Sequence, residues 1–230
     1  MAREPRQKGT SVLPVIAQLK THPDREKLVP PPLWKYFEDH LLVSAWYPEE
    51  DYFVLLQALV RTIDPKTVGG DVWRFFANYS VQRDIAGGDS PSDGKISTDA
   101  KNPSTSKSST EIKAVYRNFA SDMSGDPSQL FRRATRLWSQ YHDSGSMQLS
   151  GGRARTSSVF VQLTDFHIPI EGFVRLQGYY LEEFGRVVGV EVKSKVTRST
   201  ARGQGYCEWE YTLLRTPVSE ALVASLPPVP

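Results

Sequence analysis

The sequence predicts an α+β protein with an N-terminal helical part packed on a C-terminal β-β-α-β-β antiparallel sheet. Three observations lead to this class. Apolar residues between positions 52 and 63 recur at the i, i+3, i+4, i+7 spacing of an amphipathic helix. Apolar and polar residues alternate from 159 to 164, as in a strand with one buried face. Residues 87–109, rich in Ser, Gly, Asp, Lys and Pro, separate these two patterns.

Composition excludes several classes of protein. The 230 residues are 39% hydrophobic and 23% charged, which is ordinary for a globular chain of one or two domains. A net charge of +2 is too small to argue for a nucleic-acid partner. The single cysteine allows no intramolecular disulfide and fits a reducing compartment. We find no signal peptide and no apolar run of about 18 residues, so we expect a cytoplasmic protein without a membrane span.

The first half reads as three helices, over residues 33–42, from Pro48 to about 63, and over 70–85. The second begins with Glu49, Glu50 and Asp51, where the helix dipole favours negative charge. We interpret these carboxylates as a solvated helix start rather than as paired general acids.

Residues 87–109 hold too little apolar surface to offset the entropy of ordering them, so we expect a flexible loop. A regulatory phosphorylation role for this loop stays open. We therefore divide the chain into a helical part (1–86), the loop (87–109), a part with helices and a four-stranded sheet (110–225), and a frayed Pro-rich tail (226–230).

The second half alternates helices with pairs of strands. Helices are expected over 108–122, where Ser108 and Glu111 form a capping box, and from Asp126-Pro127 to a stop near Gly145. The remaining elements are strands at 147–150 and 159–163, a helix at 169–184, and strands at 188–192 and 207–214. The last two strands should form a hairpin. The order favours an antiparallel sheet with its helices on one face.

Three runs of the second half resemble one superfamily. They are LFRRATRLWSQYHDSG (130–145), GFVRLQGYYLEEFGRVVGVEV (172–192) and GQGYCEWEYTLL (203–214), and Gly178, Gly185, Cys207 and Trp209 account for most of the likeness. The superfamily contains the haem nitric-oxide-binding domains, the 4-vinyl reductase domains of aromatic-responsive regulators and subunits of the TRAPP particle. The segment WYPEEDYFVLLQAL (46–59) agrees with the layout of an uncharacterised paralogous family of myxobacteria.

This resemblance implies helices packed on a four-stranded sheet, with a pocket for a small molecule or an acyl chain between them in several relatives. It implies no reaction, because members are mostly sensors or adaptors. The apolar side chains that would line such a pocket, or equally form a solid core, are Trp138, Phe173, Tyr180, Cys207 and Trp209.

Haem and metal sites were tested against the histidines. Haem sensors of the superfamily use an axial histidine and a Tyr-x-Ser-x-Arg motif, and the motif is missing here. The four histidines are scattered, and we interpret His142 and His167 as capping or surface residues. With one cysteine and no metal-binding spacing, we predict no metal site and no cofactor, haem included. Cys207 is interpreted as a small buried hydrophobe.

No catalytic motif stands out, so we predict that the chain is not an enzyme. The run Asp143-Ser144-Gly145-Ser146 lacks the first glycine of a nucleophile elbow, and Gly203-Gln204-Gly205 is too short for a dinucleotide fingerprint.

Basic residues gather in two predicted turns, where they would either contact an anion or an acidic partner or simply be solvated. The anion or partner-contact candidates are Arg153, Arg155, Arg198 and Arg202, with Lys193 and Lys195 beside them. We predict a non-enzymatic small-molecule or lipid-binding sensor module with an apolar ligand. The alternative is a protein–protein adaptor or scaffold without a small ligand, which acts as a homodimer or with another protein.

Overall fold

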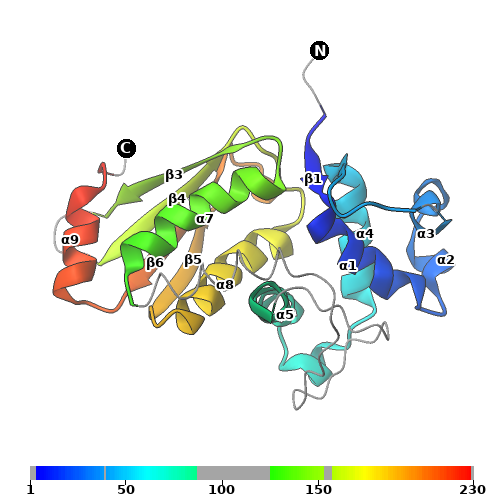
Figure 1. The fold of residues 1–230 in the computed structure, drawn as a ribbon, viewed down its shortest axis with the longest axis horizontal. Coiled ribbons are helices and arrows are strands. Elements are labelled where there is room, and N and C mark those ends of the chain that lie inside the picture. Colours follow the sequence, from blue (N-terminus) through cyan, green and yellow to red (C-terminus); the bar gives the residue numbers. More distant parts are fainter. Residues whose placement is uncertain (1–3, 39, 87–124, 153–156, 229–230) are drawn as a thin grey trace. The chain divides into compact units, whose positions relative to one another are not determined.

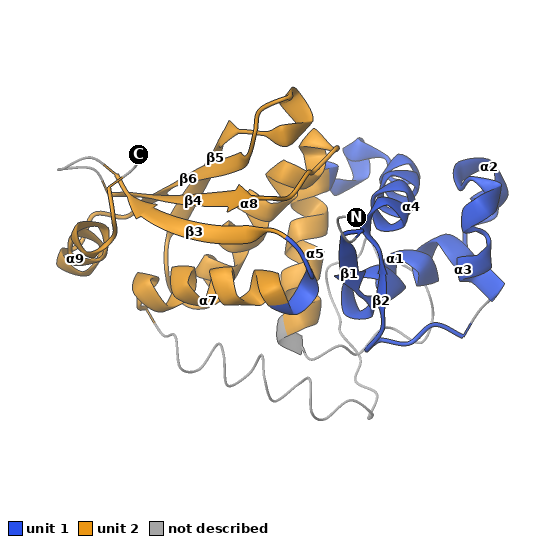
Figure 2. Ribbon diagram, turned by 90° about the horizontal axis from the view of Figure 1, so that it is seen from above, with its two compact units in different colours: residues 1–72, 89–108, 140–144 blue, residues 73–88, 109–139, 145–230 orange. Residues whose placement is uncertain are grey.

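The computed structural model describes residues 4–38, 40–86, 125–152 and 157–228. They fall into two compact units, coloured in Figure 2. Unit 1 comprises residues 1–72, 89–108 and 140–144, and unit 2 comprises residues 73–88, 109–139 and 145–230. The chain therefore passes between the units more than once, and each unit is built from separated segments.

The helices and strands keep the labels of Figure 1. The α-helices are α1 (Gly9–Lys20), α2 (Arg25–Leu28), α3 (Lys35–Glu38), α4 (Glu49–Arg61), α5 (Val72–Ala86), α7 (Pro127–Tyr141), α8 (Glu171–Val187) and α9 (Pro217–Ser225). The 3-10 helices are η1 (Pro31–Leu33), η2 (Pro65–Val68) and η3 (Thr200–Arg202). The strands are β1 (Arg6–Lys8), β2 (Trp46–Pro48), β3 (Ser146–Gly151), β4 (Ser158–Thr164), β5 (Val192–Arg198) and β6 (Cys207–Leu213).

Unit 1 is organised around a short antiparallel pair of strands. Strand β1 pairs with β2, with Gln7 opposite Tyr47, and each strand leads directly into a helix. Those helices, α1 and α4, pack on each other through fully buried residues such as Val12 and Leu55. A Cβ on Gly9 would lie 2.4 Å from the carbonyl oxygen of Leu42, so the start of α1 needs glycine for this close approach.

The segment 140–144 belongs to unit 1 although it connects α7 to β3. His142 forms an antiparallel bridge with Gln7, on the edge of β1 opposite to β2. The backbone N–H of Arg6 donates to Asp143 Oδ1 at 2.6 Å, and the N–H of Asp143 donates to the carbonyl of Arg6 at 3.1 Å. Strand β1 thereby fastens the end of α7 and the approach to β3.

Unit 2 contains a four-stranded antiparallel sheet in the order β3-β4-β6-β5. Helices α7 and α8 lie against one face of it (Figure 1). On that face Val161 is opposite Trp209, which is opposite Val196, and the indole N–H of Trp209 donates to the Val174 carbonyl of α8 at 2.8 Å. The other face is polar and hydrogen-bonded, as where Gln162 donates to Glu208 at 2.6 Å.

A buried carboxylate joins α5, α8 and β5 within unit 2. Glu182 of α8 accepts from the backbone N–H and the hydroxyl of Ser194, at 2.6 and 2.7 Å, through Oε1. Its Oε2 accepts from Arg74 of α5 at 2.8 Å. The guanidinium of Arg74 also lies 4.0 Å from the ring centroid of Tyr179. Each oxygen of this carboxylate is thus satisfied.

The outer edge of β3 is occupied by the end of the described chain. Helix α9 starts with a capping box, in which the Thr216 hydroxyl accepts from the Ser219 N–H. Beyond α9, the Pro227 carbonyl accepts from the N–H of Gly151 at 2.8 Å, and Pro228 bridges to the same glycine.

The predicted α+β class with an antiparallel sheet is confirmed, as are the helices at α4, α5, α7 and α8 and the hairpin of the last two strands. Asp126 does cap α7, because its Oδ1 accepts from the Ser128 N–H at 2.8 Å. The helix expected over 108–122 lies outside the described residues.

Several boundaries were wrong. The helix expected over 33–42 is reduced to α3 and η1. The strand expected at 188–192 begins only at Val192, because α8 runs to Val187 and Gly189 has a left-handed φ of 81° that turns the chain. The tail, expected to be frayed from 226, is held as far as Pro228. Helix α5, expected with the first part, belongs to unit 2 except for its first residue. In the described ranges, no helix is long and apolar enough to cross a membrane.

Candidate functional site

Unit 1 contains a buried polar group of three residues, Gln7, Glu49 and His142, called here the His142 cluster. Gln7 is the central residue of β1, Glu49 is the first residue of α4, and His142 directly follows α7. Residues opposite each other in antiparallel pairs project from the same face. The Gln7–His142 bridge therefore places these two side chains side by side.

The cluster is deeply buried and its hydrogen bonding is incomplete. His142 Nδ1 lies 2.9 Å from Glu49 Oε1, and Gln7, Glu49 and His142 are only 3%, 3% and 6% exposed. Oxygen Oε2 of Glu49 and oxygen Oε1 of Gln7 are buried without a hydrogen-bond partner in the described structure. Buried acceptors of this kind are rare in proteins and mark a bound water, an ion or a functional group.

Two interpretations from the sequence were wrong at this point. Glu49 does not belong to a solvated helix start, since its carboxylate is buried against a histidine, whereas its neighbour Glu50 is exposed. His142 is not a surface residue, although His167 is exposed as expected. The signal was invisible in the sequence because the pairing joins residues 93 positions apart.

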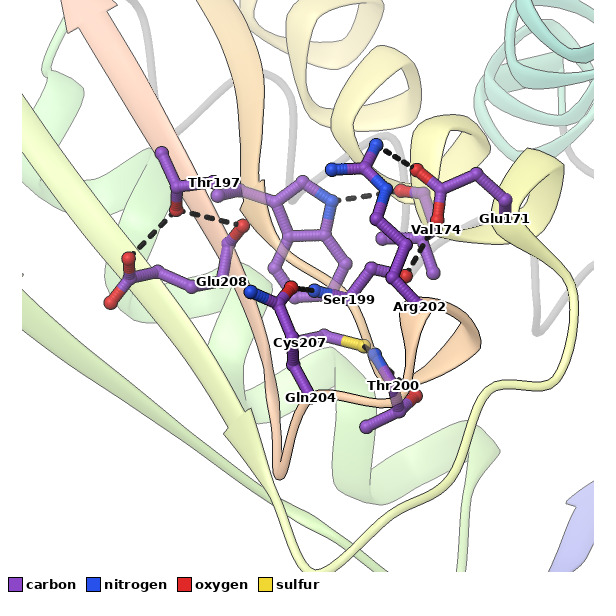
Figure 3. Close-up of polar contacts among 10 residues, drawn as sticks. Glu171, Val174, Thr197, Ser199, Thr200, Arg202, Gln204, Cys207 and Glu208 are labelled. Atoms are coloured by element: carbon purple, nitrogen blue, oxygen red, sulfur yellow. Dashed lines mark hydrogen bonds and ion pairs between the residues drawn. The ribbon is translucent and has the colours of Figure 1, made fainter.

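In unit 2, the turn between β5 and β6 is fastened to the start of α8 (Figure 3). Glu171 at the first position of α8 accepts from the Ser199 hydroxyl at 2.6 Å and forms an ion pair with Arg202. The Ser199 N–H donates to the Gln204 side chain at 2.6 Å. These contacts fasten the turn to α8, and they engage the exposed Arg202 in an intramolecular ion pair.

Cys207 lies beneath this turn and is fully buried. Its sulfur accepts from the Thr200 N–H at 3.4 Å and lies 3.3 Å from the Thr200 hydroxyl (Figure 3). Burial raises the pKa of the Cys207 thiol above its usual value, against the opposing effect of the Thr200 hydrogen bonds. The thiol is therefore held in its unreactive form, and the interpretation of Cys207 as a small buried hydrophobe agrees with this placement.

The five ligand-pocket candidates all lie in unit 2. Trp138, Phe173, Cys207 and Trp209 are each 5% exposed or less, and Trp138 meets Phe166 edge-to-face with ring centroids 4.9 Å apart. Tyr180 is half-buried and donates to Asp84 at 2.9 Å. These contacts are those of a packed core, and the role of the five in lining a pocket stays a prediction.

Of the four basic candidates, the structure describes only Arg198 and Arg202. Arg153 and Arg155 lie outside the described residues. The guanidinium of Arg198 lies 5.0 Å from the ring centroid of Tyr206, while Lys193 and Lys195 are exposed on β5. Their role as anion or partner contacts stays a prediction.

One hollow is recorded in unit 1, between α1 and α3. Its volume is about 100 Å³, and Trp34 and Phe37 contribute its apolar wall. Ligand pockets usually measure about 300–1,000 Å³, so this hollow suits water or an ion rather than an organic ligand.

Among comparisons with known proteins, only the comparison with solved structures finds similar proteins. No family model matches the chain, and no curated protein matches it. Solved structures with a similar layout are H-NOX domains. The Cs H-NOX mutant with 4-cyano-L-phenylalanine has a TM-score of 0.48 and 10% identity over 91% of this chain and 98% of its own. An oxygen-binding H-NOX domain related to soluble guanylate cyclases, in its oxygen complex, has a TM-score of 0.47 and 9% identity over 92% and 96%. An H-NOX protein from S. oneidensis in the Fe(II)NO state has a TM-score of 0.43 and 11% identity over 90% and 99%.

The chain is an α+β protein by its own helices and antiparallel sheet, and its layout is similar to that of these H-NOX domains. Nothing in the comparisons singles out the myxobacterial family. That the chain is not an enzyme stays a prediction from its sequence.

The prediction of no cofactor is wrong on this comparison. The similar structures named here are H-NOX domains, the haem-NO-binding class, and their names include Fe(II), NO and oxygen, so haem is a cofactor that has to be tested. Among the described residues, His142 has the chemistry of an iron ligand, since metal-binding histidines are commonly held by a carboxylate on the other ring nitrogen. Its surroundings, however, are the polar groups of Gln7, Glu49 and the Arg6–Asp143 pair. They fit a small ion better than the apolar faces of a porphyrin.

Proposed function

We propose that this chain is a non-enzymatic sensor module, in which a small ligand bound in unit 1 changes the conformation of unit 2. The observation that carries the proposal is the position of residues 140–144. They are built into unit 1, yet they connect α7 with β3, two elements that form part of the sheet layer of unit 2.

The mechanical argument rests on how firmly the segment is held. Strand β1 binds it through both hydrogen bonds between Arg6 and Asp143, and α4 binds it through Glu49 and His142. A ligand that separates Glu49 from His142, or draws them together, displaces the end of α7 and the start of β3. Packed elements respond to such displacements in discrete steps because their cores are close-packed.

The ligand is proposed to be small. A second version of the proposal places the ligand, a small molecule or a lipid chain, in the sheet-side core of unit 2, lined by Trp138, Phe173, Tyr180, Cys207 and Trp209. Haem is the first compound to test, because the similar solved structures are H-NOX domains, and it would supply an iron able to bind a diatomic gas.

The test has a binding step and a response step. Native mass spectrometry and an absorption spectrum, before and after incubation with haemin, identify a bound group and show a Soret band if it is haem. Amide hydrogen exchange then compares free and ligand-bound chains. We expect changed exchange in α7 and β3 of the wild type, and a much smaller change in Asp143→Ala, which still binds the ligand.

Asp24→Ala is the matched control. Asp24 directly precedes α2 and forms an exposed ion pair with Lys27 of that helix. This variant should respond as the wild type does. A ligand that binds stoichiometrically and leaves exchange in α7 and β3 unchanged would overturn the proposal.

The adaptor alternative draws little support from the described surface. The large apolar side chains exposed among the described residues occur singly or in pairs, such as Leu42 and Val43 (63% and 45% exposed) and Leu214 and Val218 (62% and 53%), of which Leu214 precedes α9. Two side chains do not make the extended apolar patch that marks a protein interface.

A further inference from the structure

We propose that Gln7, Glu49 and His142 bind one divalent transition-metal ion, for which zinc is the experimental probe. This proposal specifies the class of ligand that the site in unit 1 binds. Its signalling effect rests on the proposed function, whereas the binding itself does not.

The first argument is the set of unsatisfied atoms. Glu49 Oε2 and Gln7 Oε1 accept hydrogen bonds and cannot donate them, and each is buried without a partner among the described residues. Leaving one such group unsatisfied costs about 1–3 kcal/mol, and more if it is charged. A cation is bound by acceptors alone, so a single ion satisfies both oxygens together.

The second argument is charge. A buried carboxylate needs a compensating positive group, and Glu49 meets only the imidazole of His142 on Oε1. The guanidinium of Arg6, the residue next to Gln7 on β1, is already paired with Asp143 at 3.2 Å. A divalent ion beside Glu49 supplies the missing charge where no described side chain does.

The third argument is geometry. Tetrahedral zinc with Zn–N and Zn–O bonds of about 2.0–2.2 Å places adjacent ligand atoms about 3.3 Å apart. His142 Nδ1 and Glu49 Oε1 are 2.9 Å apart, so they need to separate by only a few tenths of an ångström, and a carboxylate that binds the ion through both oxygens also satisfies Oε2. When the ion enters, the proton shared by these two atoms leaves to solvent and is replaced by two metal bonds.

The donor types decide the class of ion. Imidazole suits zinc, copper, iron and nickel, whereas magnesium and calcium prefer oxygen alone. In the described ranges there is no group of three or more His, Cys, Asp or Glu residues able to hold a metal. The amide oxygen of Gln7 therefore has to be the third protein ligand, and a water completes the coordination.

Binding is tested by isothermal titration of the chelator-treated full chain with zinc chloride, and by native mass spectrometry. We expect one zinc per chain. Glu49→Gln and Gln7→Leu keep the shape of their side chains and should bind zinc at least tenfold more weakly. Circular dichroism and thermal unfolding establish that both variants are folded.

Two matched controls test the location. Glu50→Gln changes the exposed carboxylate next to Glu49, and His167→Ala removes an exposed histidine of unit 2. Both should bind zinc as the wild type does. The site is disproved if the wild type takes up no stoichiometric zinc, or if folded Glu49→Gln and Gln7→Leu bind it with unchanged affinity.

The same samples separate this site from the proposed function. Amide exchange in α7 and β3 is measured with and without zinc. Stoichiometric zinc that leaves this exchange unchanged supports the metal site and contradicts zinc as the sensed signal. Absence of zinc binding overturns the site, while the sensor proposal is still decided by its own ligand test.

Discussion

Gly172, the second residue of α8, lies directly against the indole of Trp73 in α5. A Cβ placed there would be 1.9 Å from Cε2 of that ring. Because the half-buried Trp73 ring and the start of α8 have to move apart to admit the added methyl group, we expect Gly172→Ala to lower the free energy of unfolding by about 1–3 kcal/mol. Urea unfolding measures the effect. Gly205→Ala is the control, since no atom lies within 4 Å of its added Cβ, and an equal loss in both variants would contradict this account.

The buried thiol gives a second prediction for a single residue. Burial raises the pKa of Cys207, so the folded chain keeps the thiol protonated at pH values where a free cysteine is already partly thiolate. We expect no reaction with a disulfide reagent such as DTNB at pH 8 over the time in which the denatured chain reacts fully. Rapid labelling of the native chain would show that Cys207 is accessible.

Single residues also show where sequence reasoning succeeds. Cys207 and Trp209 could be assigned to a buried face because alternation along one strand is a local signal. Glu49 and His142 could not be assigned, because their environment is created by a contact over 93 positions. From the local sequence alone, Glu49 is interpreted as part of a helix start and His142 as part of a helix end.

At the scale of elements, Glu182 is the residue that joins α5, α8 and β5. We expect Glu182→Ala to cost about 2 kcal/mol of stability, since it leaves the Ser194 N–H without its carboxylate acceptor and removes the ion pair with Arg74. Arg74 is half exposed, which moderates the loss.

The neighbouring Glu183→Ala is the matched control for Glu182. Glu183 pairs with the exposed Arg186 one turn further along the same helix, and this contact lowers the pKa of Glu183. Its removal should cost less than about 1 kcal/mol. Urea or thermal unfolding of both variants measures the loss of stability. Equal losses of stability in the two variants would contradict the role given to Glu182.

Elements with a long apolar stripe could be predicted, and elements defined by pairing could not. Helices α4, α7 and α8 carry their periodicity in the sequence. Strands β1 and β2 have three residues each and exist only because Arg6–Lys8 meets Trp46–Pro48. Strand β5 was misplaced because its exposed Lys193 and Lys195 belong to an edge strand, whereas the preceding valines look more like a strand.

For the whole molecule, the units do not coincide with continuous pieces of chain. A fragment of residues 1–86, the expected first domain, lacks His142 and Asp143, the partners of Gln7 and Arg6 on β1. It also carries α5 without the α8 residues that α5 contacts. We expect this fragment to show weak amide protection in α1 and α4. Native-like protection there would show that unit 1 folds without residues 140–144.

The Pro227–Pro228 contact with β3 has a consequence for solubility. An open strand edge offers unpaired backbone groups to another chain, and proline cannot extend the ladder because it has no N–H. The tail therefore ends the sheet with a surface that a second molecule cannot copy. A chain truncated after Leu226 frees the Gly151 N–H, and we expect it to self-associate at concentrations where the full chain stays monodisperse by size-exclusion chromatography.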